Sequence, residues 1–158
     1  MTEHAQQSVA AADLPERGQP LAGGTFFARY WLNGEERALV LLDNELIGSW
    51  GKYGEDVAGA KSLSDGAANT RAMAEAGNDI AVKALELDAH IPSYLEGALL
   101  MAAKSEGLVT LREDRWHWLS SQFAASYAYN MGFEDGWLDL NVKSDERVAR
   151  PVRSLPIQ

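Results

Sequence analysis

The chain has 158 residues, no cysteine and a formal net charge of −9. The length predicts a single domain, and the lack of cysteine excludes disulfides and thiolate metal sites. The net charge argues against a nucleic-acid partner, because the excess carboxylates repel phosphates. Its hydrophobic content of 46% is sufficient for a core, but no apolar run reaches the roughly 18 residues that a transmembrane helix needs. The N-terminus lacks a basic start and a long apolar stretch, so we expect neither a signal peptide nor membrane insertion.

The first 22 residues differ in composition from the rest of the chain. Residues 1–22 are polar and rich in alanine, show no sustained hydrophobic period and contain Pro15 and Pro20. Such a segment buries too little apolar surface to fold on its own. We therefore predict that residues 1–22 form an extended or disordered N-terminal arm and that residues 23–158 form the folded domain.

The folded domain is predicted to open with a β-hairpin and a loop. Within residues 25–42, two runs of β-favouring side chains flank Asn33 and Gly34. An Asn-Gly pair in this position favours a type I′ turn, because both central residues of that turn need a positive φ angle. The glycine-rich segment 48–51 indicates a loop, in which we expect Trp50 to be buried in the core.

Three helices are predicted next. Apolar residues at helical spacing indicate helices over residues 67–76 and 79–87, and Gly77 between them is a natural helix end. A capping box of Ser93 and Glu96, in which each side chain binds the other residue's backbone N–H, marks the start of the third helix. The apolar residues of that helix predict a buried stripe made of Leu95, Leu99 and Ala102, with Ala98 and Ala103 beside them.

Strands are predicted for most of the remaining chain, in the segments 108–111, 116–119, 127–133, 137–142 and 148–152. Large side chains alternate with small ones from Tyr127 to Phe133, and we expect the large ones to face the core. His117 is expected to be exposed, opposite a buried tryptophan. Asp135 and Gly136 favour a hairpin turn before the next strand.

The strand that follows this turn carries the main part of a predicted binding surface. Burial of Leu138 and Leu140 would turn Trp137 and Asp139 outward, and an exposed tryptophan beside acidic residues is a frequent hot spot of protein interfaces. We therefore predict a partner-facing surface made of Gln122, Phe123, Glu134, Trp137 and Asp139.

Three arginines near the C-terminus are expected to form salt bridges with acidic residues across the sheet and not to bind a partner, namely Arg147, Arg150 and Arg153.

Several short motifs follow one another along the domain: Gly23-Gly24, Asp65-Gly66 with Asn69-Thr70, Ile91-Pro92-Ser93 with Leu95-Glu96, Trp118 with Ser120-Ser121-Gln122, Phe133 with Asp135-Gly136, Lys143, and Ala149-Arg150 with Val152-Arg153. Together they resemble the Lcl C-terminal-domain-like family of bacterial and phage domains of unknown function, in particular its stand-alone phage and prophage variant. The resemblance implies an α+β, C-type-lectin-like fold with an N-terminal β-hairpin, two to three helices and then antiparallel strands. Leu119 departs from the family pattern, because it separates the aromatic residue from the two serines that usually follow it directly.

The residues offer little support for catalysis. Calcium-dependent sugar binding in lectins that resemble this fold uses Glu-Pro-Asn or Gln-Pro-Asp, followed by Trp-Asn-Asp, and none of these motifs occurs here. The three histidines, His4, His90 and His117, lack the spacing of metal ligands. Ser120 and Ser121 have no base nearby in the sequence and are expected to bond the backbone. We therefore expect no catalytic residue, no metal site and no cofactor, and predict that the protein is not an enzyme.

The resemblance implies a non-enzymatic, phage-type structural or adhesion protein in the virion or in the host bacterial cytoplasm. Its lectin-like module would bind a virion protein, a host protein or a cell-surface glycan, and its N-terminal arm would attach it to a virion or larger assembly. A second hypothesis is a small cytoplasmic inhibitor, an anti-defence protein that acts by surface occlusion. A third is a metal-assisted enzyme on the same fold. All three leave homo-oligomerisation open.

Overall fold

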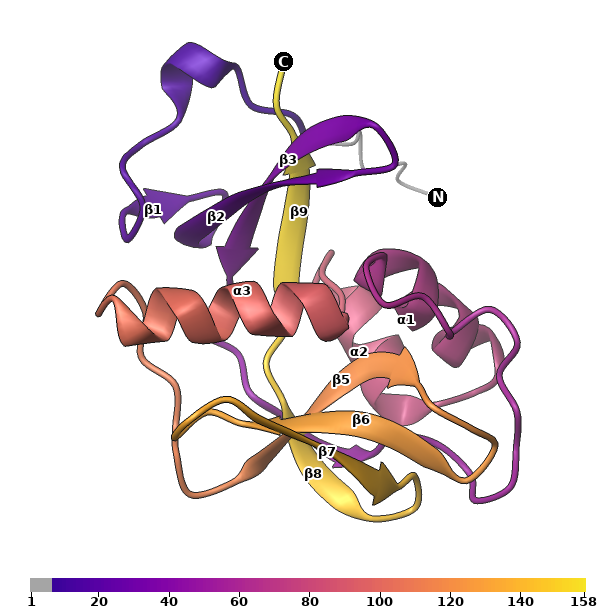
Figure 1. The fold of residues 1–158 in the computed structure, drawn as a ribbon. Coiled ribbons are helices and arrows are strands. Elements are labelled where there is room, and N and C mark those ends of the chain that lie inside the picture. The colour runs from indigo at the N-terminus through magenta and orange to yellow at the C-terminus, as the bar shows by residue number, and fades with distance from the viewer. Residues whose placement is uncertain (1–6) are drawn as a thin grey trace.

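The computed structural model describes residues 7–158, which form an α+β protein with three α-helices between and beside two β-sheets (Figure 1). The first sheet has the strand order β1-β2-β3-β9, with bounds Pro20–Leu21, Gly24–Leu32, Glu35–Leu41 and Val152–Pro156. The second has the order β4-β8-β5-β6-β7, with bounds Leu46–Ser49, Glu146–Ala149, Trp116–Gln122, Tyr127–Gly132 and Trp137–Val142. Neighbouring strands are antiparallel, except that β5 and β8 are parallel. The predicted α+β class is confirmed.

The predicted N-terminal hairpin is confirmed as β2 and β3. Asn33 and Gly34 form its turn with φ angles of 51° and 78°, and Leu32 pairs with Glu35 on either side of them. Positive φ at both positions is what a type I′ turn requires. Since β3 also pairs with β9, strands from the two ends of the described chain share one sheet.

Residues 7–22, the described part of the predicted arm, hydrogen-bond to the first sheet. The Val9 N–H donates to the Pro156 carbonyl at 3.0 Å, and the Gln158 N–H donates to the Val9 carbonyl at 2.9 Å. Further along, β1 pairs with β2 through Leu21 and Gly24. Residues 1–6 of the predicted arm lie outside the described residues.

The three helices occupy the predicted segments: α1 is Gly66–Glu75, α2 is Asp79–Glu86 and α3 is Tyr94–Ser105. Gly77 follows α1 with a φ angle of 84°, a conformation that favours glycine. The capping box of α3 is confirmed, because the Glu96 N–H donates to Ser93 Oγ at 3.1 Å and the Ser93 N–H donates to Glu96 Oε1 at 2.9 Å.

Helix α3 lies between the two sheets (Figure 1). Its buried residues are Glu96, Gly97, Leu100 and Ala103. The buried face is therefore displaced by one position from the predicted stripe: Ala103 is buried as predicted and Leu99 packs partly against the core, but Leu95, Ala98 and Ala102 are exposed. The error arises because a glutamate occupies the first turn of the buried face. Pattern analysis treats glutamate as a surface residue, whereas here hydrogen bonds draw its side chain inward.

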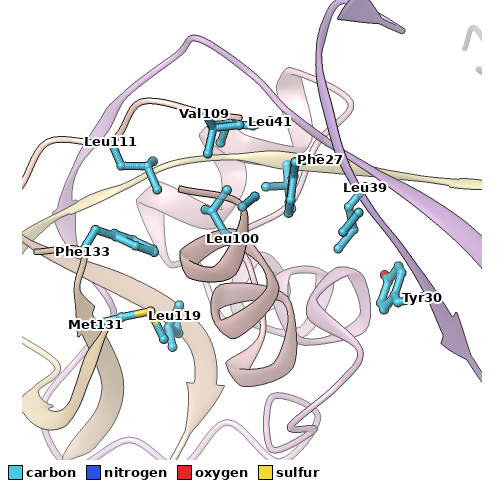
Figure 2. Close-up of a cluster of buried hydrophobic side chains, with 13 residues drawn as sticks. Phe27, Tyr30, Leu39, Leu41, Leu100, Val109, Leu111, Leu119, Met131 and Phe133 are labelled. Carbon is cyan, nitrogen blue, oxygen red and sulfur yellow. The ribbon is translucent and has the colours of Figure 1, made fainter. Parts of the chain in front are cut away.

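The main core joins both sheets through α3 (Figure 2). It packs Phe27 and Leu39 of the first sheet and Met131 of the second around Leu100. A second core covers the opposite face of the five-stranded sheet with α1 and α2, and it contains Trp50, Met73, Ile80, Ile91, Trp118, Ala128 and Ala149. The five-stranded sheet is thus packed on both faces.

Packing on both faces overturns two predictions from strand alternation. His117 is only 1% exposed instead of facing solvent, because α3 covers one face of β5 while α1 and α2 cover the other. On β6, the small residues Ala128 and Asn130 are buried as completely as Met131, whereas Tyr127 is exposed. A period of two identifies the inner face only where the other face is solvated.

Three local predictions are also corrected. Gly48 and Ser49 of the predicted loop belong instead to β4, which pairs with β8, although the expected burial of Trp50 is confirmed. The segment 108–111 is not a strand, but Val109 and Leu111 pack in the core. Two of the C-terminal arginines bind carbonyl oxygens in place of carboxylates: Arg150 reaches Leu42 and Asn44, and Arg153 reaches Ala22, Leu87 and Asp88.

Candidate functional site

Gln122 lies inside the protein, away from the predicted partner-facing surface. Its Oε1 accepts the Val57 N–H at 2.9 Å, and its amide nitrogen donates to the Val57 carbonyl at 3.0 Å. Lys143 donates to the same Oε1 and to the Glu55 carbonyl, and its ammonium lies 4.7 Å from the ring centroid of Trp50. Burial lowers the pKa of Lys143 to about 8. These bonds fasten the loop at 55–57 to the second sheet.

Phe123 belongs to an exposed surface at one end of the five-stranded sheet, and its side chain is 54% exposed. Its ring meets Tyr129 edge-on with centroids 5.8 Å apart, and Tyr129 meets Tyr94 in the same way at 5.3 Å. The Leu95 N–H donates to the Leu63 carbonyl beside them. We call this surface the aromatic patch, and it consists of Leu63, Tyr94, Leu95, Phe123, Tyr127 and Tyr129.

Trp137 lies at the other end of the same sheet and is 63% exposed. In the strand register, Gly132 of β6 is opposite both Trp116 of β5 and Trp137 of β7. Residues that are directly opposite in a sheet project from the same face, so the two tryptophans flank a glycine. A cavity of about 360 Å³ opens there, and its lining is Glu113, Asp114, Arg115, Trp116, Gly132, Glu134, Asp135 and Trp137. We call this cavity the tryptophan slot.

The lining of the tryptophan slot is set by local contacts. Asp135 Oδ1 accepts the Trp137 N–H at 3.0 Å and so holds the start of β7. On the opposite wall, Glu113 pairs with Lys104 at 2.7 Å and Asp114 pairs with Arg112 at 2.8 Å. Within residues 7–158, no hydrogen bond or ion pair engages the carboxylate of Glu134, which leaves it available to a ligand.

Asp139 is exposed on β7, the edge strand of the five-stranded sheet. Its carboxylate accepts the N–H of the next residue, Leu140, at 2.8 Å. Asn141 repeats the arrangement and accepts the Val142 N–H at 3.1 Å. Both side chains therefore cover backbone donors of their own strand.

The five residues predicted for one surface are thus distributed over several places. Trp137 and Glu134 line the tryptophan slot, and Phe123 lies in the aromatic patch at the other end of β6. Asp139 lies along the edge strand, and Gln122 is buried. Trp116 was missed, because its contribution depends on which strands become neighbours, and this information is absent from the local pattern.

A larger cavity of about 610 Å³ lies among the first sheet, α1 and the segment before α3. Its polar wall contains a cluster of Tyr30, His90 and Glu96. The Tyr30 hydroxyl donates to Glu96 Oε2 at 2.5 Å, and His90 Nε2 lies 3.1 Å from Glu96 Oε1. Gly66 makes room for this cluster, since a Cβ at that position would lie 2.2 Å from Glu96 Oε1.

The charges of this cluster are fixed by its surroundings. Burial raises the pKa of Tyr30, as does the neighbouring carboxylate, so its hydroxyl stays protonated and donates. Burial alone would raise the pKa of Glu96, but the charge of His90 and the hydrogen bonds from His90, Ser93 and Tyr30 lower it overall. Both oxygens of the ionised Glu96 carboxylate accept hydrogen bonds from the protein, which is typical of a structural role. The cluster ties the start of α3 to β2.

Two further polar side chains, those of Ser121 and His117, contact backbone carbonyls within the described part of the chain. Ser121 Oγ donates to the Ser62 carbonyl at 2.8 Å and accepts the Tyr94 N–H, as predicted, whereas Ser120 Oγ accepts a hydrogen bond from the side-chain amide of Asn69 at 3.4 Å. Burial lowers the pKa of His117 to about 4, and its Nδ1 lies 3.0 Å from the Arg115 carbonyl. No group of three metal-ligating side chains occurs within residues 7–158, and His4 lies outside this range.

The described helices include none that is long and apolar enough to cross a membrane. No protein-family model, curated protein or solved structure gave a significant match to the chain. The C-type-lectin-like fold and the family resemblance therefore stay predictions that rest on the motifs and on the order of the elements.

Proposed function

We propose that the protein is a non-enzymatic binding module with a C-type-lectin-like body, and that it recognises its partner through the tryptophan slot. The observation that carries this proposal is the 63% exposure of Trp137 on a paired strand beside a second tryptophan. Large aromatic side chains on a rigid surface contribute much of the binding energy in protein interfaces. The order of hairpin, three helices and antiparallel strands supports the lectin-like assignment.

We further propose that this module is a phage-type structural or adhesion protein that is attached to a virion or larger assembly through its N-terminal arm. The family resemblance is one support. The arrangement of the described residues is another, because residues 7–22 lie on the first sheet, whereas β7 lies on the other side of α3 (Figure 1). Attachment and partner recognition would then use opposite sides of the protein.

The test is affinity purification of the tagged protein from its native, phage-carrying host, followed by mass spectrometry. Three forms are compared: the unmodified chain, Trp137→Ala and Trp31→Ala. Trp31 is a matched control, since it is 67% exposed but lies on the hairpin of the first sheet. We expect Trp137→Ala to lose the partner that Trp31→Ala retains, with capsid or tail proteins among those recovered. Equal recovery by both variants would contradict the role of the slot.

The second candidate function is an inhibitor that occludes a host defence protein, and the aromatic patch is the observation that favours it. The side chains of this patch are exposed or half-buried, and a cluster of such apolar side chains at the surface is typical of a protein contact. Under this alternative, a host protein is recovered alone and in a fixed stoichiometry. Phe123→Ala abolishes that recovery, and Trp137→Ala leaves it unchanged.

A further inference from the structure

The tryptophan slot has the dimensions of a site for a single side chain. Trp116 and Trp137 are separated by one strand, on which Gly132 is their shared neighbour. Adjacent strands lie about 4.8 Å apart, so the two tryptophan backbones are about 10 Å apart. The glycine contributes no side chain, and the ring of Trp116 lies over it, since a Cβ built on Gly132 would lie 3.5 Å from Trp116 Cζ3. The cavity of about 360 Å³ is lined by this ring and by Trp137, against which a narrow aliphatic stem can pack.

The negative charge of the slot favours a cationic side chain over a neutral or anionic one. Its lining contains four carboxylates, from Glu113, Asp114, Glu134 and Asp135, and one guanidinium, from Arg115. Two of these carboxylates are already paired with Lys104 and Arg112, but that of Glu134 is unpaired within residues 7–158. The faces of the tryptophan rings are also electron-rich and attract cations. The chain as a whole carries a formal charge of −9, which draws basic partners toward it.

We propose that the tryptophan slot binds the cationic side chain of a lysine or arginine on a partner protein. The aliphatic part of that side chain would lie against Trp116 and Trp137, and its charged end would meet Glu134. This inference rests on the proposed function and names the chemistry of the partner. A neutral saccharide is the competing occupant that the experiment must distinguish.

The experiment uses the full chain and records the indole N–H signals of its five tryptophans by NMR. The probes are acetyl-Gly-Gly-Lys-Gly-Gly-amide, the same peptide with norleucine in place of lysine, and maltotriose. Norleucine keeps the aliphatic stem and removes the ammonium group. We expect the lysine peptide to shift the signals of Trp116 and Trp137, while the norleucine peptide has little effect. The internal references are one exposed and two buried tryptophans, namely Trp31, Trp50 and Trp118.

Two variants complete the test. Trp137→Ala should weaken binding of the lysine peptide by about tenfold, because it removes one aromatic wall. Glu134→Gln should weaken it by about threefold, because the shape is kept and only the charge is lost. Both substitutions replace exposed side chains, and the unchanged signals of Trp50 and Trp118 report that the core is intact.

Three results would overturn the inference: equal shifts with the norleucine peptide, a response to maltotriose alone, or a shift of Trp31 as large as that of Trp137. These results are separable from a failure of the proposed function. If Trp137→Ala loses the native partner but the lysine peptide does not bind, the slot is a partner site of different chemistry. If Trp137→Ala retains the native partner, the proposed function itself is wrong.

Discussion

Glu96 links three parts of the fold through one carboxylate. It caps α3 through the Ser93 N–H and accepts hydrogen bonds from Tyr30 and His90. A buried carboxylate is stable only while such donors replace the water that it has lost. Each of these donors therefore contributes more to the stability of the fold than an equivalent hydrogen-bond donor at the surface.

Tyr30→Phe is expected to destabilise the protein by about 1–3 kcal/mol, because it leaves a buried charged acceptor without one of its donors. The free energy of unfolding in urea measures this change. Tyr53→Phe is the matched control, since Tyr53 is exposed, and we expect it to change stability by less than about 0.5 kcal/mol. Equal effects of the two substitutions would show that the hydroxyl of Tyr30 contributes nothing.

His117 is expected to make stability depend on pH. Burial lowers its pKa from 6.5 to about 4, so the unfolded chain binds a proton more readily than the folded protein between these values. Stability should therefore be unaffected by His117 above pH 6.5 and should fall as the pH decreases toward 4. The loss is on the order of 3 kcal/mol for a shift of this size.

His117→Asn provides the comparison, because its amide keeps a donor near the Arg115 carbonyl but does not titrate. Unfolding in urea, measured at intervals across this pH range, should show a smaller slope for the variant. Glu96 contributes at lower pH, since its pKa lies below 4.5. An identical slope in both proteins would refute the assignment to His117.

At the scale of elements, β7 shows how an exposed edge is protected. An edge strand presents unpaired N–H groups, which favour the addition of a strand from another chain. Here Asp139 covers the Leu140 N–H and Asn141 covers the Val142 N–H. The covered donors are unavailable to an incoming strand.

Asp139→Ala combined with Asn141→Ala is expected to increase self-association, because both edge donors become free. Sedimentation velocity at several protein concentrations measures the effect. Asp139→Asn alone is the control, since it removes the charge and keeps an oxygen acceptor. This control should behave like the unmodified protein. Increased association in Asp139→Asn would instead indicate that charge repulsion protects the edge.

The elements that the sequence predicts correctly are those with a local physical cause. Asn33 and Gly34 determine a turn, Ser93 and Glu96 determine a helix start, and both act within a few residues. The burial of His117 and the inward face of α3 depend instead on elements that pack against them from distant parts of the chain. Local patterns contain no information about those partners.

The same distinction applies to the candidate site. The exposure of Trp137 follows from alternation along one strand and could be predicted. The burial of Gln122 could not, because an irregularity in the pairing of β5 with β6 between Trp118 and Gln122 changes the register there. The contribution of Trp116 to the slot also requires knowledge of which strands pair.

At the scale of the whole molecule, α3 makes the two sheets share one core. Leu100 is fully buried and contacts residues of both sheets through that core. Leu100→Ala is expected to cost about 2–5 kcal/mol and to lower the stability of both sheets in a single transition. Near- and far-ultraviolet circular dichroism in urea test this, with Leu95→Ala as the control at a partly exposed position of the same helix. Two separate transitions would contradict a shared core.

The position of the last strands has a consequence for biosynthesis. β8 lies between β4 and β5, and β9 pairs with β3, so both sheets are completed by residues 146–156. A nascent chain that still holds this segment inside the ribosomal exit tunnel lacks a central strand of one sheet and an edge strand of the other. Both sheets can therefore be completed only after residues 146–156 have left the exit tunnel, and until then the cell's chaperones meet a chain with both sheets unfinished.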